Sequence, residues 1–195
     1  MKKLMFLCAL VFISTLTHGQ NGKISSEERL LIKNSMTLAT SQLVETLSKL
    51  SEDEWTRRPA DGGWTVAECM EHIVMAMPRQ LTQLEQTLAQ PADNANDLKG
   101  NDAFVWMKIL DRGVKFKTPL PPKSGNLSKA ELLKTYEETA SRFLKMLDDK
   151  GAQWRNHFGQ TPFGQADGYQ LMILVPGHIL RHHSQILEVL NDIRT

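Results

Sequence analysis

Apolar side chains recur every three or four residues in four long stretches of the chain. This spacing puts them on one face of a helix, because an α-helix has about 3.6 residues per turn. The pattern therefore predicts four amphipathic helices, over about residues 25–50, 65–90, 128–150 and 167–193. The positions expected to face a shared core are Ile32, Met36, Ala39, Leu43, Leu47, Leu50, Val66, Met70, Ile73, Met77, Leu81, Leu84, Leu88, Leu133, Tyr136, Ala140, Phe143, Leu147, Leu171, Leu174, Val175 and Val189.

Residues at the ends of these stretches favour helix boundaries. Three capping boxes, each a serine or threonine followed three residues later by glutamate, begin at Ser25, Thr65 and Ser128. Asp167 is the expected N-cap of the fourth helix. Gly151 is the expected C′ residue that ends the third.

The pattern and the connections together predict the fold class. No stretch shows a convincing alternation of apolar and polar residues, so four helical patterns favour an all-α four-helix bundle. About fourteen residues join the first and second helices, whereas nearly forty, about 91–127, join the second and third. A connection this long lets two consecutive helices run parallel, as in bundles with one crossover. An apolar cluster inside it predicts a short helix packed on the bundle: Phe104, Val105, Trp106, Ile109 and Leu110.

The N-terminal segment has the pattern of a secretory signal peptide. Lys2 and Lys3 precede an apolar run over residues 4–16, and small residues end the segment before Gln20. The run is short for a membrane span, so an uncleaved anchor is the second interpretation. We therefore expect residues 1–19 to be a signal peptide, residues 20–195 to form a single domain, and the protein to be exported to the periplasm or the extracellular space.

Charge and cysteine content exclude several classes of function. Without residues 1–19 the chain loses two lysines and no acidic residue, so its net charge changes from +1 to −1. A chain so close to neutral has no electrostatic attraction for nucleic acid, and after signal cleavage none for an anionic membrane. Cys69 is then the single cysteine, so an internal disulfide is excluded.

Two histidines in the fourth predicted helix are the strongest candidates for chemistry. His178 and His182 are four residues apart, so they lie on one face, with Gln185 within about 60° of both. Apolar residues at the same spacing make this the inward face. Buried imidazoles need partners, and a divalent metal ion is one such partner. The alternative is a pair of hydrogen-bonded core histidines.

A metal ion would need a third ligand, and His72 in the second predicted helix is the best candidate. Its helical angle is about 100° from the main apolar stripe, which favours a site at the edge of the bundle, open to solvent. His183 is about 100° from His182, so we expect it at the surface or at the rim of the site. His157 is expected in a loop before the last helix, in a structural role.

The order and spacing of several short motifs resemble the DinB-like (DinB/YfiT) metal-binding four-helix proteins. Residues 63–68 (GWTVAE) run into Glu71 and His72, and His178-x-x-x-His182-x-x-Gln185 follows about a hundred residues later. Further matching residues are Asp53, Glu54, Trp55, Arg58, Pro59, Pro162, Phe163 and Gly164.

The resemblance covers nearly the whole chain after residue 19. It implies a bundle in up-down-down-up order and a divalent metal held by His72, His178 and His182. Members include thiol S-transferases and a thiol-dependent isomerase, and homodimers are common among them, so a homodimer is an expectation here. This sequence departs from the family pattern at Pro176 and Gly177, which we expect to bend the last helix.

Other residues near the candidate ligands have two interpretations each. Glu68 is either the capping residue of its helix or a group that orients an imidazole or acts as a general base. Cys69 is either a soft fourth ligand or a small buried apolar residue. Gln185 either supports a ligand or is a polar core residue. Trp64 and Trp106 either wall a cleft or pack in the core.

Three neutral imidazoles leave a divalent ion with an open position, as in catalytic rather than closed structural sites. We therefore predict a metal-dependent hydrolase or transferase acting on a small molecule. Export counts against a cytosolic thiol cosubstrate and favours a metal-activated water. The metalloprotease helix signature is absent, since Ile179 follows His178. Imidazole ligands do not distinguish zinc, nickel and iron. The alternative function is a non-catalytic metal-binding or interaction module in which the metal is structural.

Overall fold

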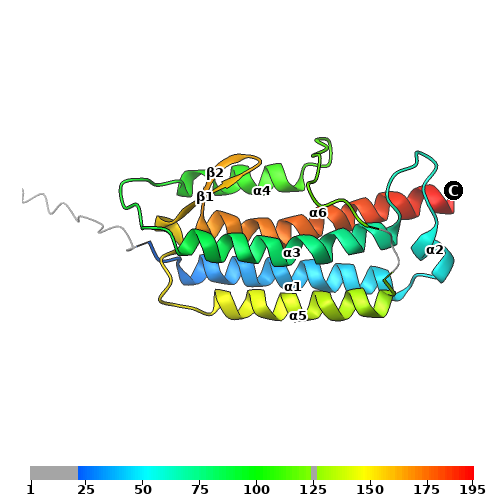
Figure 1. The fold of residues 1–195 in the computed structure, drawn as a ribbon, viewed down its shortest axis with the longest axis horizontal. Helices are drawn as coiled ribbons and strands as arrows, with labels where there is room; N and C mark the ends of the chain where they lie inside the picture. The colour runs from blue at the N-terminus through cyan, green and yellow to red at the C-terminus, as the bar shows by residue number, and fades with distance from the viewer. Residues whose placement is uncertain (1–21, 124–126) are drawn as a thin grey trace, which may run out of the picture.

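Four long helices form the body of the protein. The computed structural model describes residues 22–123 and 127–195; the predicted signal peptide lies outside them. The long helices are α1 (Ser26–Ser48), α3 (Val66–Leu88), α5 (Lys129–Leu147) and α6 (Gly168–Arg194). Figure 1 shows α1 and α6 running in one direction, and α3 and α5 running in the other. The protein is a mostly helical four-helix bundle, as the sequence predicted.

The predicted helix starts are confirmed. Reciprocal capping boxes at Ser25, Thr65, Ser128 and Asp167 begin the four long helices, and a fifth, at Ser51, begins the short helix α2 (Glu52–Thr56). Each side-chain oxygen accepts a hydrogen bond from a backbone N–H that has no partner within the helix. The end predicted at Gly151 is wrong. Helix α5 ends at Leu147 with Asp148 as its C-cap, three residues before the glycine.

The core lies between the four long helices. Apart from Leu88, Leu174 and Leu133, which are only partly buried, the predicted inward positions are buried. In the third helix Leu132 is the buried residue of the pair Leu132 and Leu133. Pro78 and Pro176 lie inside α3 and α6, and both helices continue through them. Every helix in the described part of the chain is too short or too polar to span a bilayer.

The long connection between α3 and α5 carries the predicted short helix. Helix α4 (Asp102–Leu110) follows a single 3-10 turn (Lys99–Asn101) and packs along α6, outside the four-helix layer (Figure 1). Val105 and Ile109 are its buried residues. After α4, residues 115–120 line a cleft together with residues of α3 and α6, and we call residues 111–123 the crossover segment.

A small β-hairpin precedes α6, which the prediction of an all-helical chain did not include. Strands β1 (Phe158–Thr161) and β2 (Gly164–Asp167) pair antiparallel, with Phe158 opposite Asp167 and Thr161 opposite Gly164. Each strand has four residues, and neither FGQT nor GQAD shows the apolar alternation that indicates a half-buried strand. Gly164 completes the turn with φ +109°, a conformation that favours glycine.

One arginine joins the starts of three helices. Arg155 forms ion pairs with Glu28 in the first turn of α1 (2.6 Å), with Asp102 of α4 (2.6 Å) and with Asp167 at the N-cap of α6 (2.8 Å). Its guanidinium also lies 4.0 Å from the ring centroid of Tyr169. The Arg155 side chain is only 10% exposed. This network therefore holds the end of the bundle where α6 begins.

Candidate metal centre

The three predicted ligands come together between two neighbouring helices. His72 lies on α3, and His178 and His182 lie one turn apart on α6. The ring centroids of His178 and His182 are 4.5 Å apart, and that of His72 lies 5.1 Å from the first and 4.6 Å from the second. Each residue offers one ligand nitrogen, and the three nitrogens lie within 4.8 Å of one another. The tertiary structure thus assembles the cluster that the sequence predicted.

Hydrogen bonds fix the tautomer of two of these rings. The backbone carbonyl of Leu120 accepts a hydrogen bond from Nδ1 of His72 (2.8 Å). The side-chain oxygen of Gln185 accepts one from Nδ1 of His182 (2.9 Å). Since a carbonyl oxygen can only accept, both Nδ1 atoms carry the proton, and both Nε2 atoms keep a lone pair free for a ligand bond. Such supporting bonds usually orient metal-binding histidines.

The arrangement of the nitrogens fits a divalent ion. Nε2 of His72 and Nε2 of His178 lie 3.2 Å apart. Two ligands at Zn–N distances of about 2.0–2.1 Å on a tetrahedral ion are about 3.3 Å apart. Within the described residues the buried Nδ1 of His178 has no hydrogen-bond partner, so this ring is the least satisfied of the three. A cation between the rings would accept the facing lone pairs.

The surroundings keep the imidazoles neutral. Burial lowers the pKa of His182 to about 3, with the neighbouring His72 adding to the effect. Burial also lowers the pKa of His72, and it lowers that of His178 well below the ordinary histidine value. A neutral imidazole is the form that binds a metal ion. All three side chains are therefore in the ligand form at neutral pH.

Glu68 and Cys69 are engaged elsewhere. The Glu68 carboxylate accepts hydrogen bonds from the Thr65 backbone N–H (2.9 Å) and from Arg58 (2.7 Å), so both of its oxygens have partners away from the histidines. Its predicted role as a base stays a prediction, whereas its capping role is observed. Cys69 is fully buried in the apolar core, and burial raises the pKa of its thiol to about 12. It lies outside the cluster of ligand atoms.

Two histidine predictions need correction. His183 was expected at the surface or rim, but it is buried, and its Nε2 lies 2.9 Å from the Thr46 hydroxyl of α1. His183 is buried because α1 packs on that side of α6. The helical angles within α6 alone do not show this contact. His72 was expected at an open edge of the bundle but is only 4% exposed. The crossover segment at Leu120 covers it.

A cleft of about 1140 Å³ opens beside the cluster. Its floor is the groove between α3 and α6, and its rim includes the crossover segment after α4 and the hairpin turn. All three histidines line it. Trp64 also lines it, with its ring stacked on that of His182 at 6.1 Å, whereas Trp106 packs against the core. The centre is therefore reachable by a small molecule.

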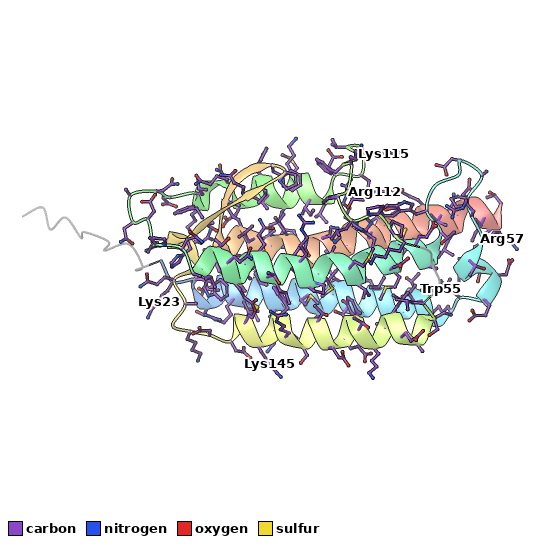
Figure 2. The ribbon with its side chains drawn as sticks, viewed as in Figure 1. Lys23, Trp55, Arg57, Arg112, Lys115 and Lys145 are labelled. Carbon is purple, nitrogen blue, oxygen red and sulfur yellow. The ribbon has the colours of Figure 1, made fainter. Side chains whose placement is uncertain are left out.

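The segment that covers the centre is held by contacts that the sequence analysis did not find. Arg181 of α6 donates hydrogen bonds to the backbone carbonyls of Asp111 and Val114. Arg112 forms a two-bond ion pair with Glu188 of α6, at 3.1 and 2.7 Å. Figure 2 shows Arg112 and Lys115 above α6. Backbone carbonyls carry no sequence signal, so the Leu120 contact could not have been predicted.

Comparisons with known proteins agree with this geometry. A family model described as the DinB superfamily matches residues 36–186. A solved structure described as "YfiT from Bacillus subtilis is a probable metal-dependent hydrolase with an unusual four-helix bundle topology" matches with a TM-score of 0.60 and 16% sequence identity. The match covers 88% of this chain and 90% of that chain, and at this identity it shows a shared fold. The search of curated proteins finds no match. The family model spans most of the chain, which therefore belongs to the DinB superfamily.

Proposed function

We propose that this protein is a metal-dependent hydrolase or transferase that acts on a small molecule, with His72, His178 and His182 as the metal ligands. The observation that carries the proposal is the convergence of three neutral ring nitrogens within 4.8 Å beside an open cleft. The structurally similar YfiT, described as a probable metal-dependent hydrolase, supports the same class of reaction.

The chain's own residues would hold the ion and orient the substrate. A divalent ion in this position would polarise a carbonyl or phosphoryl oxygen and lower the pKa of a bound water molecule. Gln185 and the Leu120 carbonyl hold two ligand rings in the tautomer that presents Nε2. Trp64 walls the site on one side and limits the access of bulk water to the ligand rings.

Hydrolysis is the preferred reaction if the protein is exported. The pattern of residues 1–19 supports export to the periplasm or the extracellular space. Export would separate the enzyme from a cytosolic thiol cosubstrate, so water is the nucleophile that we propose. A buried Cys69 with a raised pKa also leaves the site without a protein thiolate of its own.

A non-catalytic module with a structural metal is the second candidate function. Structural zinc sites have closed shells, in most cases with four protein ligands. Here the cluster found in the described residues contains three, and a large cleft adjoins it. These two observations favour the catalytic proposal.

Metal content tests the ligand assignment. Protein purified without an affinity tag should contain about one divalent ion per chain, and the variants His72→Ala, His178→Ala and His182→Ala should contain almost none. His183→Ala is the matched control, since His183 is a buried histidine on the same helix outside the cluster. Equal metal content in the control and in the three ligand variants would refute the assignment.

Turnover separates the two candidate functions. Metal-loaded protein should hydrolyse members of a panel of small esters, and chelation or His182→Ala should abolish the activity. A protein that binds metal stoichiometrically but shows no turnover on esters, and none on electrophiles with added thiol, would favour the structural module. Activity that is unchanged in His182→Ala would contradict the metal-dependent mechanism.

A further inference from the structure

The cleft beside the histidines is lined by more cationic than acidic side chains. Five cationic side chains line it, namely Arg79, Arg112, Lys115, Lys117 and Arg181. Two of them are already engaged. Arg112 is paired with Glu188, and Arg181 donates to backbone carbonyls of the crossover segment.

Among the described residues the other three cations form no direct ion pair, although Lys115 lies near enough to Glu188 to help lower the pKa of that carboxyl group. Among residues 22–123 and 127–195, no carboxylate lies within ion-pair distance of Arg79, Lys115 or Lys117. The acids of the lining are Asp61, Glu188 and Asp192, so five cationic side chains stand against three acidic ones. The cleft therefore carries an excess of positive charge.

Arg79 is placed to reach a molecule bound at the histidines. It follows His72 by seven residues on α3, so the two side chains leave the same face, about 20° apart and about 10 Å apart along the helix axis. Both line the cleft, with Ala76 of the same face between them. A ligand of a few atoms' length could touch the centre at one end and Arg79 at the other.

The crossover segment brings the other two cations and an apolar surface. Lys115 and Lys117 flank Phe116, which is 41% exposed and meets Phe163 of the hairpin turn edge-to-face at 5.2 Å. Both rings line the cleft. Apolar surface next to unpaired cations suits a molecule with an apolar body and an anionic group.

The three histidines also favour an anionic molecule in the cleft. Three neutral imidazoles contribute no negative charge, so a divalent ion held by them would keep its full charge. From these observations we infer that the cleft is a binding site for a small organic anion, a carboxylate or a phosphate ester, whose charged group lies against Arg79, Lys115 and Lys117. The inference rests on the proposed function, because it names the class of substrate that this site would take.

Calorimetric titration with three small aromatic probes tests the inference. Benzoate and phenyl phosphate carry the two candidate anionic groups, and benzamide is an uncharged counterpart of benzoate. At least one anion should bind about tenfold more tightly than benzamide, and the tighter of the two anions identifies the preferred group. Equal affinities for benzoate, phenyl phosphate and benzamide would overturn the inference.

Charge-neutral variants locate the binding site. Arg79→Gln and Lys117→Gln should each weaken anion binding about fivefold to tenfold and leave benzamide binding unchanged. Lys145→Gln is the control, since Lys145 is exposed on α5, across the bundle from the cleft (Figure 2). If Lys145→Gln lowers anion affinity as much as Arg79→Gln does, the effect is general electrostatics and the site is refuted.

The same titrations on chelator-treated protein separate this inference from the proposed function. If metal-free protein still prefers the anion and still responds to Arg79→Gln, the anion site stands whatever the outcome of the metal assays. If the protein binds metal at the three histidines but shows no preference for anions, the anion site fails and the proposed metal-dependent function survives.

Discussion

Gly177 of α6 packs directly against Ile109 of α4. A Cβ atom at Gly177 would lie 2.6 Å from Cγ2 of Ile109, closer than two carbon atoms can approach. The glycine at position 177 thus has a structural reason, since it lets α4 approach α6 one residue before the proposed ligand His178. Helix α4 in turn leads into the segment that covers the centre.

The effect of Gly177→Ala should depend on Ile109. In the native background the added methyl group should destabilise the protein by about 1–2 kcal/mol, because overpacking outweighs the higher helix propensity of alanine. In an Ile109→Ala background the space is free, and the same change should stabilise the protein by up to about 1 kcal/mol. Urea unfolding measures both values. The same sign in both backgrounds would contradict the packing argument.

Gln185→Leu should weaken metal binding about 10-fold to 100-fold, because His182 loses the acceptor that holds its tautomer and ring orientation. Gln185→Glu retains an acceptor and should bind metal at least as tightly as the native protein. Competition with a chromophoric chelator measures these affinities. Gln83→Leu is the control, because Gln83 lines the same cleft but donates to Gln160 of the hairpin. An equal loss in both leucine variants would argue against a supporting role for Gln185.

Arg155→Met should destabilise the protein by about 3–5 kcal/mol, since it leaves Glu28, Asp102 and Asp167 without their shared cation. Arg142→Met removes an exposed ion pair with Glu85 and should cost less than about 1 kcal/mol. Chemical unfolding of the two variants compares them. Similar losses would show that the Arg155 network is not a structural centre.

The contribution of Glu28 should depend on pH. Burial alone would raise the pKa of its carboxyl group, but hydrogen bonds from the Ser25 backbone N–H and from Arg155 outweigh burial, and the pKa is lowered. A carboxylate with a lowered pKa stabilises the fold above its unfolded pKa of about 4.3, and this stability is lost as pH falls through the folded pKa.

Glu28→Gln should therefore cost about 1–3 kcal/mol at pH 7, and the gap to the native protein should narrow below about pH 4. Unfolding free energies of the two proteins between pH 7 and pH 3 measure the gap. A gap that stays constant, or widens, as pH falls would contradict the assigned charge interaction.

Metal removal should lower thermal stability. At a free ion concentration of about 1,000 times Kd, binding adds about 4 kcal/mol, which for a domain of this size raises Tm by roughly 8–16 °C. A thermal melt with and without chelator measures the shift. His182→Ala should melt at the same temperature in both conditions. A chelator-sensitive Tm in that variant would place the ion elsewhere.

Local sequence signals identified most of the helical architecture. The periodic burial of residues such as Ile32, Met36 and Leu43 follows from the geometry of a helix alone, as do the capping boxes at its start. Hairpin strands of four residues without apolar alternation carry no such signal. Helix α5 ends at Leu147, and Gly151 does not adopt the positive φ that is typical of a C′ glycine. The Arg155 network joins residues more than a hundred positions apart, so no window of sequence contains it.

The pair His178 and His182 could be read from the chain itself, because four residues on one helix are neighbours whatever surrounds the helix. The position of His72 beside them, the carbonyl of Leu120 over its ring and the burial of His183 against Thr46 depend on how separate helices pack. The cationic cleft has the same origin, since Arg79, Lys117 and Arg181 come from three segments. The spacing of residues along the chain determines which side chains share one face of a helix. Side chains that are distant in sequence come together only when their helices pack around a common core.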